Sequence, residues 1–172
     1  VSPDGKYIVF QSNRSGARNL WRVDIDGSNA QQVTSGSFVD ESPVFSPDGR
    51  SVIFTSTRSG TATIWKVGID GGEPKQLTDH PSQFPMVSPD GKFVSYFYVD
   101  KQSNNEPKLA MIPAEGGASV KTIDLPRTVQ PIAFAWMPDG LSIAYLDNGS
   151  GIFNVWTQPL DGKAPRGRGV LQ

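Results

Sequence analysis

The chain has no cysteine and a single histidine, His80, and no hydrophobic stretch approaches the length of a membrane span. Without cysteine there is neither a disulfide framework nor thiolate chemistry, and the compartment is left open. The usual zinc sites are disfavoured, since they draw their ligands mainly from cysteine and histidine. A Gly-x-Ser-x-Gly nucleophile elbow, a phosphate-binding loop and a dinucleotide fingerprint are missing as well. We therefore expect no metal, no cofactor, no catalytic residue and no membrane insertion.

An excess of charge of one sign is missing too, because 16 lysines and arginines stand against 17 aspartates and glutamates. The net charge of −1 and the pI near 5.8 give no electrostatic reason to expect nucleic acid binding. The basic cluster Lys163, Arg166 and Arg168 lies near the end of the chain and is interpreted as a solvated terminal segment. Nucleic acid is therefore not an expected partner.

Glycine and proline are abundant, and they recur in a fixed order with aspartate. Successive Pro-Asp-Gly turns are separated by 44, 42 and 49 residues, close to the roughly 40 to 50 residues of a four-stranded propeller blade. A serine precedes the first three turns, and Met137 precedes the fourth. The four copies are Pro3-Asp4-Gly5, Pro47-Asp48-Gly49, Pro89-Asp90-Gly91 and Pro138-Asp139-Gly140. Proline presets a type I turn and glycine accepts the positive φ at its exit, so each copy is predicted to join two strands of a hairpin.

A short β-rich run follows each turn, and the four runs superimpose with a period of two residues. Small or apolar residues also occupy the alternate positions, so both faces of these strands are expected to be buried, as in stacked sheets. The aligned positions are Ile8, Val52, Val94 and Ile143, followed on the same face by Phe10, Phe54, Tyr96 and Tyr145.

A further strand in three of the four repeats carries a tryptophan at the same place, at Trp21, Trp65 and Trp156. Recurrence in register predicts that these side chains belong to the blade core. We expect Met111 to replace the tryptophan in the third repeat. Trp136 precedes the fourth turn, aligns with Phe45 and Val87, and is expected to be buried near the inner strand. Lys101 to Pro107 is predicted to be an inserted hydrophilic loop.

These patterns predict an all-β fold, a β-propeller built of about four four-stranded antiparallel blades. The repeat units are approximately residues 1–37, 38–81, 82–128 and 129–172. Only Val1 precedes the serine of the first turn, so the first blade is expected to lack most of its inner strand. We interpret the chain as part of a larger propeller, with a closed four-bladed ring as the alternative. Open blade edges would favour self-association.

The cycle of Ser-Pro-Asp-Gly, apolar strand, Arg-Ser-Gly, Ile-Trp strand, Asp-Gly-Gly and Gln-Leu-Thr resembles the β-propeller repeat of the TolB family, a WD-type repeat. The likeness covers essentially the whole chain, and the third and fourth repeats depart from it because they lack the Arg-Ser-Gly loop. The resemblance implies a bacterial protein and a role in protein recognition, and it favours a periplasmic or other extracytoplasmic location.

Strands that alternate in direction place all the glycine turns at one end of the blades and the longer, more varied loops at the other. Rigid scaffolds usually bind through such variable loops, so we expect a protein partner or small ligand there. Arg14 and Arg58 recur at one repeat position, which favours an architectural task such as pairing with Asp40 or Asp79. The candidate binding face comprises Asp40, Glu41, Asp79, His80, Phe84 and Arg127. His80 is interpreted as an ordinary loop histidine, with a pH-sensitive contact or a base held by Asp79 as alternatives.

The first functional hypothesis is a non-catalytic binding module, a scaffold or sensor segment of a bacterial protein. The second is part of the propeller that gates a serine peptidase of the prolyl oligopeptidase type, with the chemistry outside this chain. The third, disfavoured by the shortage of histidine and metal ligands, is a propeller polysaccharide lyase.

Overall fold

The computed structural model describes residues 1–100 and 104–168, which form fifteen β-strands and no helix, in four antiparallel sheets. None of these residues lies in a helix that could cross a membrane. The first two sheets are β1 (Tyr7–Ser12), β2 (Asn19–Asp24) and β3 (Gln31–Gln32), then β4 (Asp40–Phe45), β5 (Ser51–Ser56), β6 (Thr63–Gly68) and β7 (Gly71–Gln76). The other two are β8 (Gln83–Val87), β9 (Phe93–Asp100), β10 (Glu106–Pro113) and β11 (Lys121–Asp124), then β12 (Val129–Trp136), β13 (Ser142–Asp147), β14 (Asn154–Pro159) and β15 (Arg166–Arg168).

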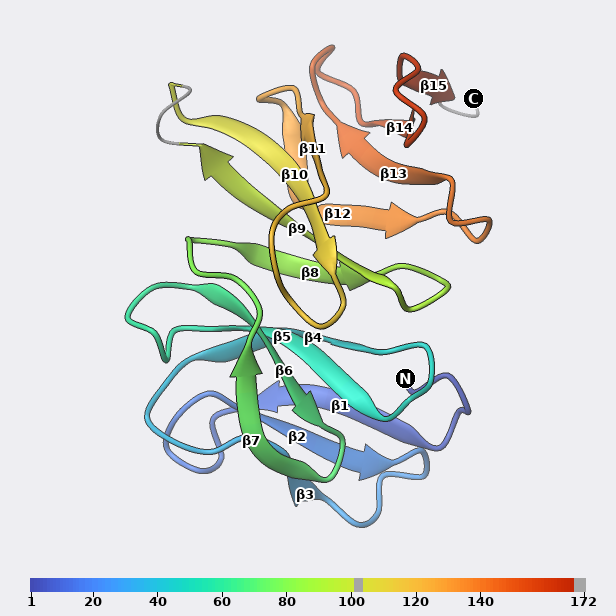
Figure 1. Ribbon diagram of the computed structural model, residues 1–172. Coiled ribbons are helices and arrows are strands. Elements are labelled where there is room, and N and C mark those ends of the chain that lie inside the picture. Colours follow the sequence, from blue (N-terminus) through green and yellow to red (C-terminus); the bar gives the residue numbers. More distant parts are fainter. Residues whose placement is uncertain (101–103, 169–172) are drawn as a thin grey trace.

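Each sheet is one blade of a propeller, and its strands follow one another in chain order. Blade 1 has the three strands β1 to β3, and blades 2, 3 and 4 have four strands each. The sequence predicts this difference, because blade 1 is expected to lack most of its inner strand. The innermost strands of blades 2, 3 and 4 succeed one another, since β8 contacts both β4 and β12. Figure 1 shows the blades in an arc, with blade 1 (blue) at the bottom of the view and blade 4 (orange to red) at the top. This arrangement differs from the alternative of a closed four-bladed ring.

The core lies in the layers between blades, because the strands are apolar on both faces. Val52 and Phe54 face blade 1, where they pack with Leu20. The alternate residue Ile53 faces blade 3, where it packs with Val94. All five side chains are buried, and a third cluster joins blade 3 to blade 4. The prediction that both strand faces are buried is confirmed for blade 2.

The Pro-Asp-Gly segments form the predicted turns, the first directly before β1 and the other three between consecutive strands of blades 2, 3 and 4. Gly49, between β4 and β5, has a φ of 70°, and the glycines of the other three turns have φ between 68° and 72°. A side chain added at Gly49 would lie 3.6 Å from Cδ of Pro3, in the turn of the preceding blade, and Gly91 faces Pro47 in the same way. The turns therefore stack from blade to blade.

The strand register corrects two expectations for blade 3. Ala110, not Met111, pairs with Tyr96 and occupies the position that tryptophan holds in the other blades. Glu106 and Pro107 belong to strand β10 and not to an inserted loop. Residues 101–103 of that expected loop lie outside the described residues, as do residues 169–172.

Candidate binding face

The blades present two different ends. The turn end carries the Pro-Asp-Gly turns and the acidic-glycine turns, such as the one between β6 and β7. The loop end carries segments 13–18, 33–39, 57–62, 77–82, 125–128 and 148–153. This division follows from the antiparallel order of the strands within each blade, which the sequence predicted.

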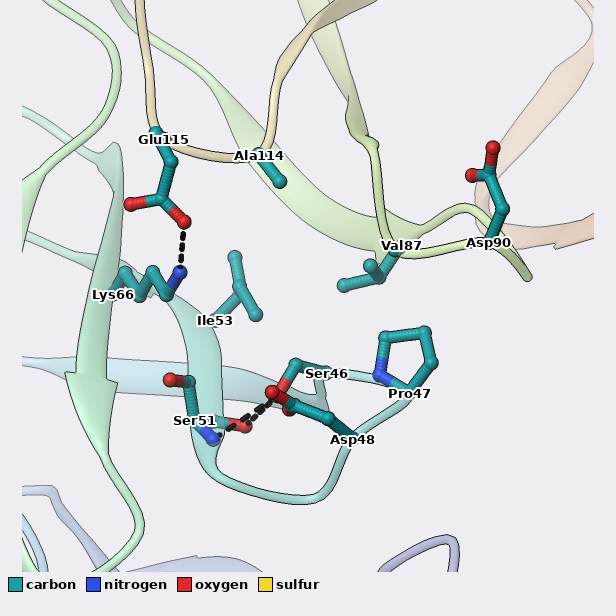
Figure 2. A pocket seen from close by; sticks show the side chains of 11 residues that line it. Ser46, Pro47, Asp48, Ser51, Ile53, Lys66, Val87, Asp90, Ala114 and Glu115 are labelled. Atoms are coloured by element: carbon teal, nitrogen blue, oxygen red, sulfur yellow. Dashed lines mark hydrogen bonds and ion pairs between the residues drawn. The ribbon is translucent and has the colours of Figure 1, made fainter.

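The turn end contains a hollow of about 430 Å³ between blades 2 and 3 (Figure 2). Its polar side chains are engaged within the fold. The Ser46 hydroxyl donates to the Asp48 carboxylate over 2.6 Å and accepts a bond from the Ser51 N–H over 3.0 Å. Lys66 of blade 2 pairs with Glu115 of blade 3 at 2.6 Å, as Arg22 of blade 1 pairs at 2.7 Å with the turn of blade 2. This hollow is a product of the repeated architecture.

The aspartates of these turns are stabilised as anions. The serine hydroxyl lowers the pKa of Asp48, and the Arg50 N–H that also donates to this carboxylate adds to the effect. The same serine contact lowers the pKa of Asp4 and Asp90 in the equivalent turns. These residues therefore hold the turn together, as their recurrence predicts.

At the loop end, Arg58 performs the architectural task that its recurrence predicted. Its guanidinium lies 2.7 Å from the carboxylate of Asp40 and stacks over the rings of Phe54 and Trp65. Asp40 has no exposed surface. Asp40 was expected on the candidate binding face, but it is inside the blade and cannot contact a partner.

Arg14, at the same repeat position of blade 1, uses other contacts. Its guanidinium lies 4.9 Å from the ring centre of Trp21, and its Nε donates to Ser12. Glu41 pairs with Arg18 over 3.0 Å, and both side chains are partly exposed. Glu41 is therefore tied between blades 1 and 2 but still reaches solvent.

His80 connects an exposed carboxylate to a buried hydroxyl. Nδ1 lies 3.1 Å from the Asp79 carboxylate and Nε2 lies 3.2 Å from the Tyr96 hydroxyl. The rings of Tyr96 and Tyr98 lie 5.6 and 5.4 Å from the imidazole. Burial raises the pKa of Tyr96 to about 12, so its hydroxyl stays protonated at neutral pH. The contact with Asp79 was anticipated from the sequence, and the two tyrosines were missed.

Phe84 lies in an apolar groove at the inner strands, about 320 Å³ in volume. The groove is lined by Ser42, Pro43, Val44, Phe84, Pro85, Met86 and Phe134. Phe84 and Ser42 have φ values of 54° and 53°, a conformation that side-chain-bearing residues rarely adopt. Both stand at the irregularities where β4 and β8 shift register against their neighbours. Backbone strain of this kind is often concentrated at binding sites.

Arg127, the last candidate, lies between blades 3 and 4 at the loop end. Its guanidinium donates to the Asn104 carbonyl over 2.8 Å and lies 3.7 Å from the Glu106 carboxylate. More than half of its side chain is exposed. The structure thus separates the exposed candidates into the His80 cluster, the groove at Phe84, and Glu41 and Arg127 at two different blade boundaries.

Within residues 1–100 and 104–168, no group of three or more acidic, histidine or cysteine side chains is placed to hold a metal. The buried Ser82 hydroxyl bonds to the His80 carbonyl and to Thr78, and not to the imidazole. The two ring nitrogens of His80 instead contact the Asp79 carboxylate and the Tyr96 hydroxyl. Ser82 is therefore not paired with the imidazole as the serine of a catalytic dyad would be.

The missed groove residues have a partial signal in the sequence. Pro43 and Pro85 stand at the same repeat position, and proline within a strand points to an edge or a bulge. Phe134 carries no such signal, because it reaches the groove from a third blade.

Comparison with known proteins agrees with this architecture. A family model described as the TolB beta propeller domain matches residues 1–167. The TolB structure from Acinetobacter baumannii superposes on 95% of the chain with a TM-score of 0.77 and 22% identity. A TolB-type structure from Agrobacterium tumefaciens covers 72% of the chain with a TM-score of 0.62 and 29% identity. The chain spans only 40% and 47% of the length of these two proteins.

Peptidase propellers are similar in fold as well. The acylaminoacyl peptidase of Pyrococcus horikoshii covers 95% of the chain with a TM-score of 0.65 and 12% identity, and the match takes up 30% of that protein. At this identity the likeness concerns the fold alone.

Proposed function

Because the chain belongs to the TolB β-propeller domain family, we propose that it is a non-catalytic module that binds a protein partner at the inner strands of its blades. The observation that carries the proposal is the apolar groove at Phe84. It lies at the inner strands of three successive blades and is flanked by two residues held at positive φ.

The lining of the groove favours a polypeptide segment with apolar side chains as the occupant. Phe84, Phe134 and Met86 offer aromatic and flexible apolar surface, and Pro43 and Pro85 give it rigid walls. Ser42 adds a polar side chain to the lining. A pocket of mainly apolar side chains with a few polar groups is the usual form of a specific binding site.

Peptide selection tests this proposal while the natural partner is unidentified. The chain is immobilised, binding peptides are selected from a random display library, and their dissociation constants are measured by calorimetry. We expect Phe84→Ala to weaken the selected peptides at least tenfold, while Lys75→Ala at the turn end leaves affinity unchanged. Peptides that bind both variants as well as the original chain would contradict the proposed site.

A second candidate function is part of the gating propeller of a prolyl-oligopeptidase-type serine peptidase. The observation behind it is that the acylaminoacyl peptidase of Pyrococcus horikoshii contains a propeller of the same fold. The two candidates differ in the parent protein. A hydrolase domain elsewhere in that protein, together with peptidase activity, would support the second candidate, and a parent without such a domain would support the binding module.

A further inference from the structure

A second hollow, about 470 Å³ in volume, opens on the face of blade 3 that is turned toward blade 2. We call it the Ala110 hollow. Its lining includes His80, Pro81, Tyr98, Ala110, Ser119 and Thr122. It differs from the groove at Phe84, which lies at the inner strands, because it is formed by the outer strands β9, β10 and β11.

The Ala110 hollow lies where the other blades place a tryptophan. In the strand register, Trp21 pairs with Phe10 and Trp65 pairs with Phe54. Blade 4 repeats this arrangement on β13 and β14. In blade 3 the corresponding partner of Tyr96 is Ala110. Its methyl group is buried but much smaller than an indole, and the hollow lies beside it. Among the described residues, blade 3 is therefore the blade that lacks a tryptophan at this position.

Blade 2 shows how the fold encloses a tryptophan at this position. The Trp65 Nε1 donates to Thr63 over 2.7 Å, and the Arg58 guanidinium lies 5.2 Å from its ring centre. Phe38, from the segment that enters β4, contacts the same guanidinium. His80 belongs to the segment that enters β8, so blade 3 also supplies an aromatic ring from this direction.

The chemistry of the walls suits a flat ring. His80 and Tyr98 form a T-shaped pair with an interplanar angle of 73°, and His80 is fixed by Asp79 and by the hydroxyl of Tyr96. Aromatic groups prefer such edge-to-face or offset neighbours. Ala110 provides a small apolar floor. The hollow thus combines fixed aromatic walls with the absence of a bulky side chain.

We propose that the Ala110 hollow receives the aromatic ring of a tryptophan or tyrosine side chain of the protein partner, in the place that tryptophan fills in the other blades. This inference rests on the proposed function. Ser119 and Thr122 at the rim are exposed, so the hollow is open enough for a ring that is carried by another polypeptide. The segment from His80 to Phe84 also connects the hollow with the groove, so one partner can contact both.

The test is a nuclear magnetic resonance titration of the intact chain with N-acetyl-tryptophanamide, and with N-acetyl-leucinamide as the matched control. We expect saturable shifts of the Ala110 methyl and of the His80 and Tyr98 ring signals with the tryptophan derivative only. Equal shifts with both derivatives, or none at these residues, would overturn the proposal.

Ala110→Trp is the matched variant, because it restores the side chain that the other blades use. We expect it to fold and to weaken binding of the tryptophan derivative at least tenfold, and unchanged affinity would refute the proposal. Tyr98→Ala is an independent variant that removes a wall and should also weaken binding.

The same titration separates this inference from the proposed function. Phe84→Ala leaves the hollow intact, so it should bind the tryptophan derivative as the original chain does. If selected peptides bind the groove but the derivative fails to bind, the Ala110 hollow alone is ruled out. If the derivative binds and no peptide depends on Phe84, the groove is ruled out and the hollow stands.

Discussion

Asp40 is a buried carboxylate whose charge is balanced by Arg58. Removing the partner of a buried ion leaves an uncompensated charge, which typically costs about 3 to 5 kcal/mol. We expect Arg58→Met to lower the free energy of unfolding by this amount in urea titrations. Arg14→Met is the control, since the exposed Arg14 contacts rings and a serine, for which about 1 kcal/mol or less is expected. Equal losses of unfolding free energy in the two variants would show that the contact with Asp40 stabilises the fold no more than the contacts of Arg14 do.

The turn aspartates lead to a prediction for acid pH. Asp48 has a lowered pKa, so its interaction with Ser46 stabilises the folded chain above the ordinary pKa of about 4 and is lost as the pH falls through the folded value. Ser46→Ala should raise the pKa of Asp48 and cost on the order of 1 kcal/mol or less near neutral pH. The difference from the original chain should shrink toward pH 2. A difference in unfolding free energy that stays constant with pH would contradict this account.

At the residue scale, recurrence was the useful signal. Arg58 could be assigned to a carboxylate at the loop end because it repeats Arg14, and the structure confirms Asp40 as its partner. The burial of Asp40 could not be predicted in the same way, since a charged residue in a loop segment looks exposed in the sequence. The contact of His80 with Tyr96 was also hidden, because it joins a loop to strand β9 through a tertiary contact that sequence spacing does not indicate.

At the scale of the elements, the turn between β4 and β5 isolates a backbone effect. Gly49 has a φ of 70°, and an added Cβ would meet Pro3 at an ordinary contact distance of 3.6 Å. Gly49→Val should therefore destabilise the fold mainly through its backbone conformation, by about 1 to 3 kcal/mol. Gly49→Asn should cost less, since asparagine tolerates this conformation. Thermal unfolding of both variants checks the prediction, and equal losses would point to side-chain packing instead.

The strands themselves could be predicted from the period of two residues, but the irregular positions could not. Ala110 was overlooked at the tryptophan position because the pattern offered Met111 as the nearest large side chain, whereas hydrogen-bond pairing decides the register. The positive φ of Ser42 and Phe84 likewise has no sequence signature, since neither residue is a glycine. The regular parts of the blade are encoded locally, and the candidate sites arise where tertiary pairing departs from the repeat.

At the scale of the whole molecule, none of the described residues forms a blade against the outward face of blade 4, which ends the arc (Figure 1). Trp156 packs toward blade 3, so the alternating side chain of Val155 points to the other face, where 45% of it is exposed. Ile152 and Phe153 next to it are exposed as well. Apolar surface of this kind favours association.

We therefore expect the chain to self-associate, with a mass by light scattering that rises above 18.6 kDa as the concentration increases. Val155→Lys should shift this equilibrium toward the monomer, because a charge on the apolar face must be desolvated in the contact. Val120→Lys is the control, since Val120 is also exposed but belongs to blade 3. Equal effects of the two substitutions would mean that general charge and not the blade 4 face governs association. A constant mass of 18.6 kDa at every concentration would instead show that the face is stable in water, because the inter-blade layers already bury enough apolar surface to hold the four blades together.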